Sequence, residues 1–206
     1  MTEQDFLNAF YRPWIVENKA DAPFIEANRP AAVLICLFSH KGKMHVLFTE
    51  RAKHLKHHAG QISFPGGKAE KTDVDLVDTA YRESVEEIGL ERSHLRLLGR
   101  LGVYKTISGF AVLPIVAVYD KPLNIKYDLI IDANEVASVF SVPLKYLMDL
   151  KHYHVEKIHR KGQLFPVYFI PYKEHMIWGA TAGILAQLQA HISTHLPPVA
   201  NTQSQS

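Results

Sequence analysis

The most constraining feature of this 206-residue sequence is an acidic, amphipathic helix that follows a strand and a Gly-Gly pair. The spacing of apolar residues over 76–88 predicts the helix, with Asp75 as N-cap and Gly89 as left-handed C-cap. The 3.6-residue period predicts a buried face made of Val77, Tyr81, Val85 and Ile88, with Ala80 and Ser84 beside them. This helix and the turn in front of it carry most of the functional information in the chain.

Short apolar runs separated by turn residues predict strands on both sides of that helix. Upstream, the pattern predicts a hairpin of strands 31–38 and 45–49, and a strand at 61–64 that stops at Pro65-Gly66-Gly67. Downstream, it predicts strands at 95–104, 110–118 and 136–142, a short helix at 144–150, a hairpin of 152–159 with 164–170, and a closing helix at 177–192. An N-terminal helix is expected to end near Asn18, and a polar tail from Pro197 is expected to be disordered.

Composition excludes several classes of protein. The chain is 47% hydrophobic and 21% charged, which is typical of a globular domain with a sizeable core. Its 23 Lys and Arg against 21 Asp and Glu give a net charge of +2, which favours neither nucleic acid nor an anionic membrane as a partner. The longest apolar run, 31–38, is far below the roughly 20 residues of a membrane-spanning helix. The N-terminus lacks the layout of a secretory signal, and the single Cys36 allows no internal disulfide. We therefore expect a cytosolic α/β or α+β domain.

Three glutamates converge at the edge of the buried face of the predicted helix. Glu83, Glu86 and Glu87 fall within an arc of about 100°, and Arg82 offers the nearest counter-charge. Oxygen ligands of this kind select hard divalent cations such as Mg²⁺ or Mn²⁺. A solvated acidic face is the alternative. The Gly-Gly pair favours the metal, because its bare backbone lets a metal-bound phosphate approach closely. The pattern predicts a site for diphosphate chemistry, in which metal ions activate a water.

A basic segment, residues 51–58, precedes the Gly-Gly pair. It contains Arg51, Lys53, Lys56 and three histidines but no acid. Beside a metal site, such a segment would bind phosphate groups, and His58 is the histidine expected nearest the substrate. A solvated loop that balances the acidic helix is the alternative.

Other candidate sites are weaker. The twelve histidines have no cysteine partners and no HExxH pattern, so a zinc site is not expected. Cys36 lies in an apolar strand, which raises the pKa of a thiol and argues against a nucleophile. Tyr168, Phe169 and Tyr172 would either stack on an adenine or pack at an edge of the fold.

The run from Gly67 to Leu90 resembles the sequence box of the Nudix hydrolases. Residues 82–90, RESVEEIGL, follow the family's order of Arg-Glu-apolar-x-Glu-Glu-x-Gly-apolar. Asp73 stands at the family's mid-loop glutamate, with a gap to Arg82 one residue longer than in the common form, and Ser84 stands at the apolar position. The longer gap is typical of one branch, the coenzyme A pyrophosphatases.

A second motif of that branch is matched just upstream. The pattern Leu-apolar-Thr-x-Arg-Ser/Ala-x₃-Arg-x₃-Gly-x₃-Phe-Pro-Gly-Gly corresponds to residues 47–67, with Lys56 in place of the second arginine. Arg and Lys are not equivalent at a bidentate phosphate contact, which leaves the contribution of Lys56 open. Residues 135–144 and 177–181 are also similar to later segments of the branch.

The resemblance implies a Nudix α/β/α sandwich with a mixed sheet, formed by residues 1–196 as one domain with 1–28 as a helical extension and 197–206 as a tail. It implies Mg²⁺ or Mn²⁺ held by Glu83, Glu86 and Glu87 with the Gly67 backbone, and Arg82 orienting the carboxylates. Some members use an acid from a distant loop. Glu135 is the candidate here, and a cap in the turn at 132–134 is its alternative role.

The substrate implied by the branch is coenzyme A or a derivative, cleaved to 3′,5′-ADP and 4′-phosphopantetheine. ADP-ribose, NADH or a nucleoside triphosphate are alternative substrates, and a non-catalytic nucleotide-sensing module is an alternative of another class. No nucleic acid or membrane partner is expected, and the chain would be a monomer or a homodimer.

Overall fold

A long central strand, β2 (Arg29–His40), organises the structure, a computed structural model that describes residues 1–13, 18–21, 26–55, 58–160 and 163–193. Its side chains alternate between two apolar clusters, as the period of a strand requires. Ile35 and Leu37 lie in the cluster that includes helix α4, whereas Leu34 and Cys36 lie in the cluster that includes helix α2. Both faces of the strand are therefore buried, which explains its nearly continuous apolar sequence.

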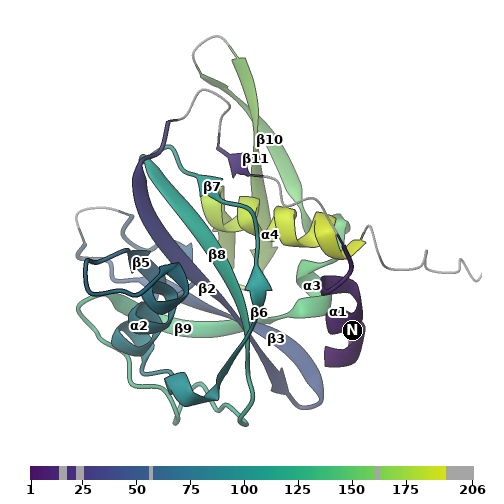
Figure 1. Cartoon of the computed structure of the whole chain (residues 1–206). Helices are drawn as coiled ribbons and strands as arrows, with labels where there is room; N and C mark the ends of the chain where they lie inside the picture. Colours follow the sequence, from purple (N-terminus) through teal and green to yellow (C-terminus); the bar gives the residue numbers. More distant parts are fainter. Residues whose placement is uncertain (14–17, 22–25, 56–57, 161–162, 194–206) are drawn as a thin grey trace, which may run out of the picture.

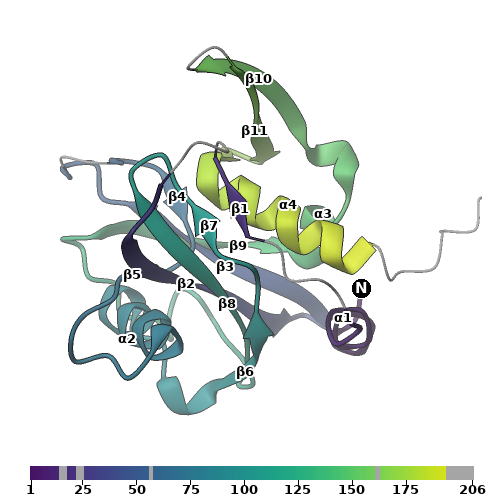
Figure 2. The same ribbon diagram turned by 45° about the horizontal axis from the view of Figure 1, so that its top comes forward.

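Nine strands of the described residues form one mixed sheet around β2 (Figures 1 and 2). Their main order is β1 (Lys19–Ala20), β7 (Tyr104–Lys105), β8 (Phe110–Tyr119), β2, β3 (Lys43–Arg51) and β4 (Ile62–Ser63). Three more strands pair with this path: β5 (Gly66–Lys68) with β2, β6 (Leu95–Arg100) with β8, and β9 (Val136–Pro143) with β3. The β2–β8 and β1–β7 pairs are parallel and the remaining pairs are antiparallel, so the predicted mixed sheet is confirmed.

Helices cover both faces of this sheet. Helix α2 (Leu76–Ile88) packs on one face, and α4 (Gly179–Ser193) packs on the other with α1 (Glu3–Phe10) and α3 (Leu144–Leu147) (Figure 2). This arrangement is the expected α/β/α sandwich. A second, antiparallel sheet of β10 (His154–Arg160), β11 (Gln163–Tyr172) and β12 (His175–Trp178) extends away from the main sheet (Figure 1). Short 3₁₀ turns lie at Arg92–His94 and Leu150–His152. In the part of the chain that the structure describes, no helix is both long and apolar enough to cross a membrane.

The predictions with local signals are confirmed. Helix α2 begins and ends where expected: the Asp75 side chain accepts the Asp78 N–H at 2.8 Å, and Gly89 adopts a left-handed φ of 69°. The β2–β3 and β10–β11 hairpins and strand β9 form as predicted. Lys41 and Gly42 both have positive φ at the first of these turns, as a tight hairpin connection requires.

The sequence suggested that the Gly66-Gly67 pair ends a strand in a turn. The pair instead belongs to strand β5, which pairs with β2. Gly66 has a φ of 152°, and a Cβ there would lie 2.6 Å from the Val33 Cα. Only glycine allows the two backbones to approach this closely. The glycines are thus part of the sheet, directly beside α2.

Element boundaries differ in places where pairing or proline overrides the periodic pattern. The N-terminal helix ends at Phe10 rather than near Asn18, because Pro13 disfavours helical geometry at the residue before it. The expected strand 95–104 is split into β6 and β7, which both pair with β8. The helix predicted at 144–150 ends at Leu147, and the strand predicted from His152 begins at His154, because a 3₁₀ turn separates them.

The closing helix begins at Gly179, since Ile177 and Trp178 pair with β11 instead. Residues 14–17, which include part of the expected N-terminal helix, and the expected tail at 197–206 lie outside the described residues.

Candidate active site

Helix α2 is rotated relative to the expectation from its sequence. Val85, expected inside, is 41% exposed, whereas the carboxylate-bearing Glu87 is only 3% exposed. The fully buried residues on the inner face of the helix include Ala80, Ser84 and Ile88. Strand β5 is a neighbour on this face of the helix, since its Gly66 N–H donates to the Glu87 carboxylate.

Glu87 is a buried carboxylate with a single backbone donor among its described contacts. Its Oε2 accepts the Gly66 N–H at 3.1 Å. Burial raises the pKa of Glu87 to about 8, and the negative charges of Glu83 and Glu135 act in the same direction. The Gly66 N–H and the positive charge of Arg51 favour the ionised form but do not offset burial. The site therefore needs further positive charge to keep Glu87 ionised at neutral pH.

Glu83 lies one helical turn before Glu87 and directly against Gly67. A Cβ on Gly67 would come within 2.7 Å of the Glu83 Oε2, so residue 67 has to be glycine for this carboxylate to keep its place. Burial raises the pKa of Glu83, and Arg82 partly offsets that effect. Two carboxylates and the Gly66-Gly67 backbone thus meet at one edge of β5.

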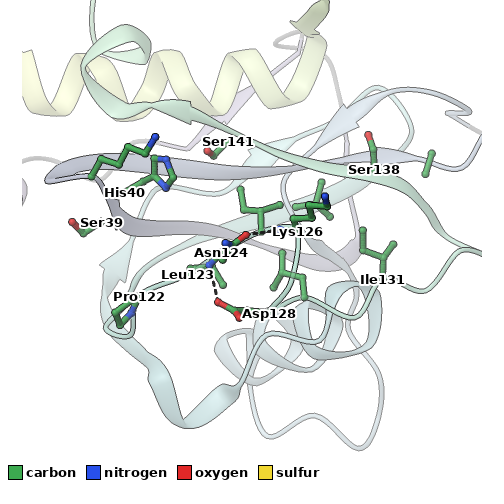
Figure 3. A pocket seen from close by; sticks show the side chains of 15 residues that line it. Ser39, His40, Pro122, Leu123, Asn124, Lys126, Asp128, Ile131, Ser138 and Ser141 are labelled. Atoms are coloured by element: carbon green, nitrogen blue, oxygen red, sulfur yellow. Dashed lines mark hydrogen bonds between the residues drawn. The ribbon is translucent and has the colours of Figure 1, made fainter.

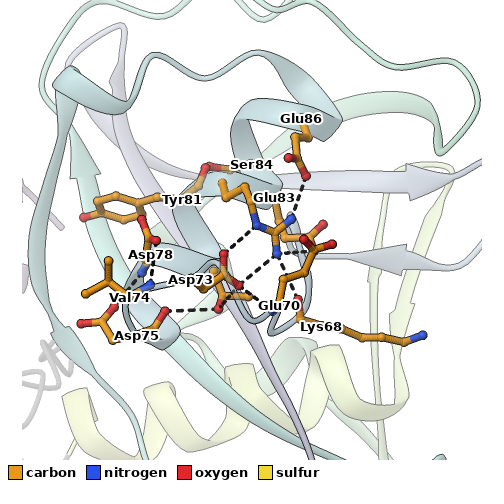
Figure 4. Close-up of polar contacts among 12 residues, drawn as sticks. Lys68, Glu70, Asp73, Val74, Asp75, Asp78, Tyr81, Glu83, Ser84 and Glu86 are labelled. Carbon is orange, nitrogen blue, oxygen red and sulfur yellow. Dashed lines mark hydrogen bonds and ion pairs between the residues drawn. The ribbon is translucent and has the colours of Figure 1, made fainter.

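Arg82 links the loop before the helix to carboxylates on the helix. The acids that it contacts are labelled in Figure 4. Its Nε is 2.8 Å from Asp73 Oδ1, its Nη1 is 2.8 Å from Glu86 Oε2, and its Nη2 is 3.1 Å from Glu83 Oε1. The Nη2 also donates to the Lys68 carbonyl at 3.1 Å. The Arg82 guanidinium holds the pKa of Asp73 well below its usual range. One arginine therefore contacts three acids.

Glu86 extends away from the other two helix glutamates. Its side chain is 59% exposed and its carboxylate pairs with Arg82. Over the described ranges, no group of three or more His, Cys, Asp and Glu side chains is arranged as a ready-made metal site. The donor set itself fits a hard cation: all candidate ligands are oxygens, and the charge of Arg51 does not offset the burial of Glu87 beside Glu83.

Arg51 and Glu135 reach this site from other parts of the sheet. Arg51 ends β3, where its N–H donates to the Gln61 carbonyl at 2.9 Å, and its charge acts on Glu87. The Glu135 carbonyl accepts the Ala52 N–H at 2.8 Å, and the Glu135 charge raises the pKa of both Glu83 and Glu87. Glu135 also lies in the expected turn, since its N–H donates to the Asp132 carbonyl at 3.0 Å.

Comparisons with known proteins identify the family. The model of the NUDIX domain matches residues 28–160. The chain belongs to the Nudix family. It is 41% identical over 170 residues to the uncharacterized Nudix hydrolase NudL of Yersinia pestis (strain Pestoides F) and, to the same degree, to that of Yersinia pseudotuberculosis serotype O:1b (strain IP 31758). Each match covers 82% of this chain and 83% of the relative.

The fold agrees with a solved Nudix structure. RenU, a Nudix hydrolase from M. smegmatis, aligns with a TM-score of 0.52 and 16% identity, over 84% of this chain and 90% of RenU. The protein is thus a Nudix hydrolase that acts on diphosphate bonds and binds nucleotide-type small molecules. The family typically uses divalent metal ions.

The other described basic residues of segment 51–58 that were expected to bind substrate have no described contact with the Nudix helix. Lys53 and His58 are exposed, and His58 Nδ1 forms a hydrogen bond of 2.7 Å with Gln61 Oε1. Lys56 lies outside the described residues. Of the four basic residues expected to bind substrate, Arg51 is one whose charge acts on a helix carboxylate, that of Glu87.

Thr79 is a site residue that the sequence pattern did not reveal. It is fully buried in the first half of α2, and its hydroxyl donates to Asp73 Oδ2 at 2.8 Å. A threonine on the buried stripe of a helix is indistinguishable from a packing residue in the sequence. A partner six residues upstream in a loop leaves no periodic signal.

The other candidates from the sequence are core or surface residues of the Nudix fold. Cys36 is fully buried and burial raises its pKa to about 12, which agrees with its expected lack of nucleophilicity. Tyr168 and Tyr172 pack against the larger apolar cluster, whereas Phe169 stacks in parallel with Trp178 at a centroid distance of 6.1 Å.

A hollow of about 820 Å³ is a further feature of the described structure (Figure 3). It is lined by the end of the β2–β3 hairpin, the loop 122–131 and part of β9, with His40, Asn124, Lys126 and Ser141 among the polar residues. Neither Glu83 nor Glu86 nor Glu87 lines it. The hollow and the carboxylates beside β5 are therefore two separate features of the described structure.

Proposed function

We propose that this Nudix hydrolase cleaves the diphosphate of coenzyme A or a derivative, releasing 3′,5′-ADP and 4′-phosphopantetheine or its acyl form. The observation that carries the proposal is the position of Arg51. This residue belongs to the upstream motif that resembles the coenzyme A pyrophosphatases, and its charge acts on the buried Glu87 of the Nudix helix. Two motifs that are separate in the sequence therefore contribute to one site.

The proposed metal ligands are Glu83, Glu86 and Glu87, together with the Gly67 backbone, and the proposed ion is Mg²⁺ or Mn²⁺. The ion would stabilise negative charge on the diphosphate and lower the pKa of the attacking water. The oxygen-only donor set and the uncompensated burial of Glu87 support this assignment.

The chain's own residues would divide the remaining work. Arg82 orients Glu83 and Glu86 and does not itself bind the substrate, because all of its described contacts are protein oxygens. One of the helix glutamates, or a water that it holds, accepts the proton of the attacking water, and Glu135 is a further acid close enough to act on the same charges. Arg51, with Lys53, Lys56 and His58, would bind phosphate groups of the substrate.

The proposal includes the organisation of the chain. Residues 1–196 would act as one Nudix domain with residues 1–28 as an extension and 197–206 as a tail, in a monomer or homodimer. No nucleic acid or membrane is part of it.

A substrate panel tests the proposal. Coenzyme A, dephospho-coenzyme A, an acyl-coenzyme A, ADP-ribose, NADH and a dinucleoside polyphosphate are incubated with Mg²⁺, with Mn²⁺ or with a chelator, and products are identified by chromatography and mass. Metal-dependent release of 3′,5′-ADP from coenzyme A, faster than any other cleavage, is the expected result. Faster cleavage of ADP-ribose or NADH would contradict the coenzyme A assignment, and nucleotide binding without turnover would indicate a sensing module.

A further inference from the structure

The loop acid Asp73 is held by donors on three sides. Its carboxylate accepts the Glu70 N–H at 2.8 Å, the Thr79 hydroxyl at 2.8 Å, and the Arg82 Nε and Nη2 at 2.8 and 3.2 Å. The Asp73 side chain is 3% exposed, so water cannot replace a donor that is lost. Of these donors, only Thr79 and Arg82 act through side chains.

The Thr79 proton is committed to Asp73. A threonine inside a helix commonly donates to the carbonyl four residues earlier, which here is that of Asp75 at 3.2 Å. A hydroxyl carries a single proton, and the shorter contact is the one to Asp73 at 2.8 Å. The carboxylate is also the stronger acceptor, because hydrogen bonds to charged groups are roughly twice as strong as neutral ones.

The position of Asp73 decides where Arg82 points. The guanidinium is a rigid, planar fork, so fixing its Nε and Nη2 edge against one carboxylate also fixes the direction of Nη1. That nitrogen is 2.8 Å from Glu86, and Nη2 is 3.1 Å from Glu83 (Figure 4). A shift of Asp73 would therefore be transmitted through the arginine to Glu83 and Glu86.

We propose that Thr79 is a positioning residue for the metal-binding carboxylates. By holding Asp73, it sets the angle of Arg82, which in turn holds Glu83 and Glu86 where they bind the metal. This inference rests on the proposed role of those two glutamates as ligands, and it does not depend on which diphosphate is the substrate.

Two substitutions at this position separate the hydroxyl from the packing. Thr79→Val keeps the shape and removes the donor, whereas Thr79→Ser keeps the donor and removes a methyl group. Mn²⁺ binding is measured by electron paramagnetic resonance of the free ion, without substrate, and thermal unfolding is measured in a chelator. Thr79→Val is expected to weaken Mn²⁺ binding roughly tenfold and to lower kcat with little change in KM, because such supporting contacts cost about 10–100-fold. Thr79→Ser is expected to bind Mn²⁺ within about twofold of the unsubstituted protein, since its donor remains.

The pathway through Asp73 is tested by a double-mutant cycle. In an Asp73→Ala background, Thr79→Val should have no further effect on Mn²⁺ binding, because the intermediate acceptor is gone. Equal losses from Thr79→Val and Thr79→Ser, in step with their losses of thermal stability, would overturn the inference and leave Thr79 as a packing residue. Effects that simply add in the cycle would overturn it as well.

Glu86→Gln distinguishes a failure of this inference from a failure of the proposed function. Weaker Mn²⁺ binding by Glu86→Gln with unchanged binding by Thr79→Val overturns the role of Thr79 and leaves the metal site in place. Weaker binding by both variants, but not by Thr79→Ser, supports the inference even if coenzyme A is not cleaved. Unchanged binding by both variants overturns the inference and the metal assignment together.

Discussion

The proposed active site has an acidic half, formed by Asp73, Arg82 and the helix glutamates, and a basic half, formed by the described residues of the basic segment. The two halves differ in how their side chains are held. In the acidic half, Arg82 contacts Asp73, Glu83 and Glu86 and a backbone carbonyl, all within 3.2 Å. In the basic half, Lys53 and His58 are exposed, and the described polar contact of His58 is to its neighbour Gln61. Rigid support suits groups that stabilise charge in the transition state, because their positions cost no reorganisation during the reaction.

The basic half has the properties of a surface that the substrate itself orders. In the proposed function, the exposed lysine and histidine side chains would gain their partners when a polyphosphate binds, and they would lose side-chain entropy at that moment. Substitutions in the acidic half should therefore lower kcat, and those in the basic half should mainly raise KM. Each experiment below tests or refines this difference.

The largest effect is expected from Glu86→Gln. Removing one preorganised group of this kind costs roughly 10²–10³ in kcat, and the fold should be unaffected because Glu86 is 59% exposed. The rate is measured at saturating metal and substrate, and thermal unfolding in a chelator is the control. A rate close to that of the unsubstituted enzyme would remove Glu86 from the metal site.

The buried Glu87 should make metal-free stability depend on pH. Its pKa is raised in the fold to about 8 from 4.5, so the unfolded chain loses this proton at a lower pH than the folded chain. The free energy of unfolding should therefore fall as pH rises between about 5 and 8, by an amount on the order of 2–3 kcal/mol. Glu87→Gln, which stays neutral, should not show this decrease. Urea unfolding at several pH values in a chelator measures both, and identical pH profiles for the two proteins would contradict the burial of an uncompensated charge.

Arg82→Lys should lower kcat roughly 10–100-fold, because lysine cannot contact Asp73 and two glutamates as a planar fork does. Arg92→Lys is the matched control. Arg92 lies in the 3₁₀ turn after α2 and pairs with Asp78 of that helix, but the Arg92 side chain is 56% exposed. A surface ion pair of this kind contributes about 0–1 kcal/mol and no catalysis. Steady-state kinetics measure kcat for both variants. An equal loss of kcat in the two would show that the contacts of Arg82 have no particular role in catalysis.

The smallest effect is expected in the basic half. Arg51→Ala should raise the KM for coenzyme A about tenfold with little change in kcat, as expected for the loss of uniform binding. Dephospho-coenzyme A should be affected less if Arg51 contacts the 3′-phosphate. Lys53→Ala, an exposed neighbour, is the matched comparison and should change KM less. A fall in kcat with unchanged KM in Arg51→Ala would place this residue with the preorganised half.

The candidate site was only partly predictable. Arg82 and its contacts with Glu86 follow from a four-residue spacing on a helix, which any amphipathic pattern displays. The burial of Glu87 and the role of Thr79 were not predictable, because both depend on elements from outside the helix: β5 for Glu87 and the loop acid Asp73 for Thr79. The same limit explains the error at Val85, which periodicity assigned to the core.

The sequence by itself determined the elements whose signals are local. The limits of α2 depend on a side-chain cap at Asp75 and a left-handed glycine at residue 89, and the β2–β3 hairpin depends on the turn at Lys41-Gly42. These signals act over a few residues of chain, so no tertiary contact is needed to interpret them. The order of glutamates on α2, on which the proposed diphosphate chemistry depends, belongs to the same group.

Only the tertiary structure decided how those glutamates are used. Pairing of Gly66 with Val33, more than thirty residues away, turned an apparent loop into β5, whose Gly66 N–H donates to the Glu87 carboxylate. Pairing of β3 with β4 and β9 brought Arg51 and Glu135 to the same carboxylates. Burial and charge are properties of the packed molecule, since they depend on which distant segments meet, and local sequence patterns do not record that.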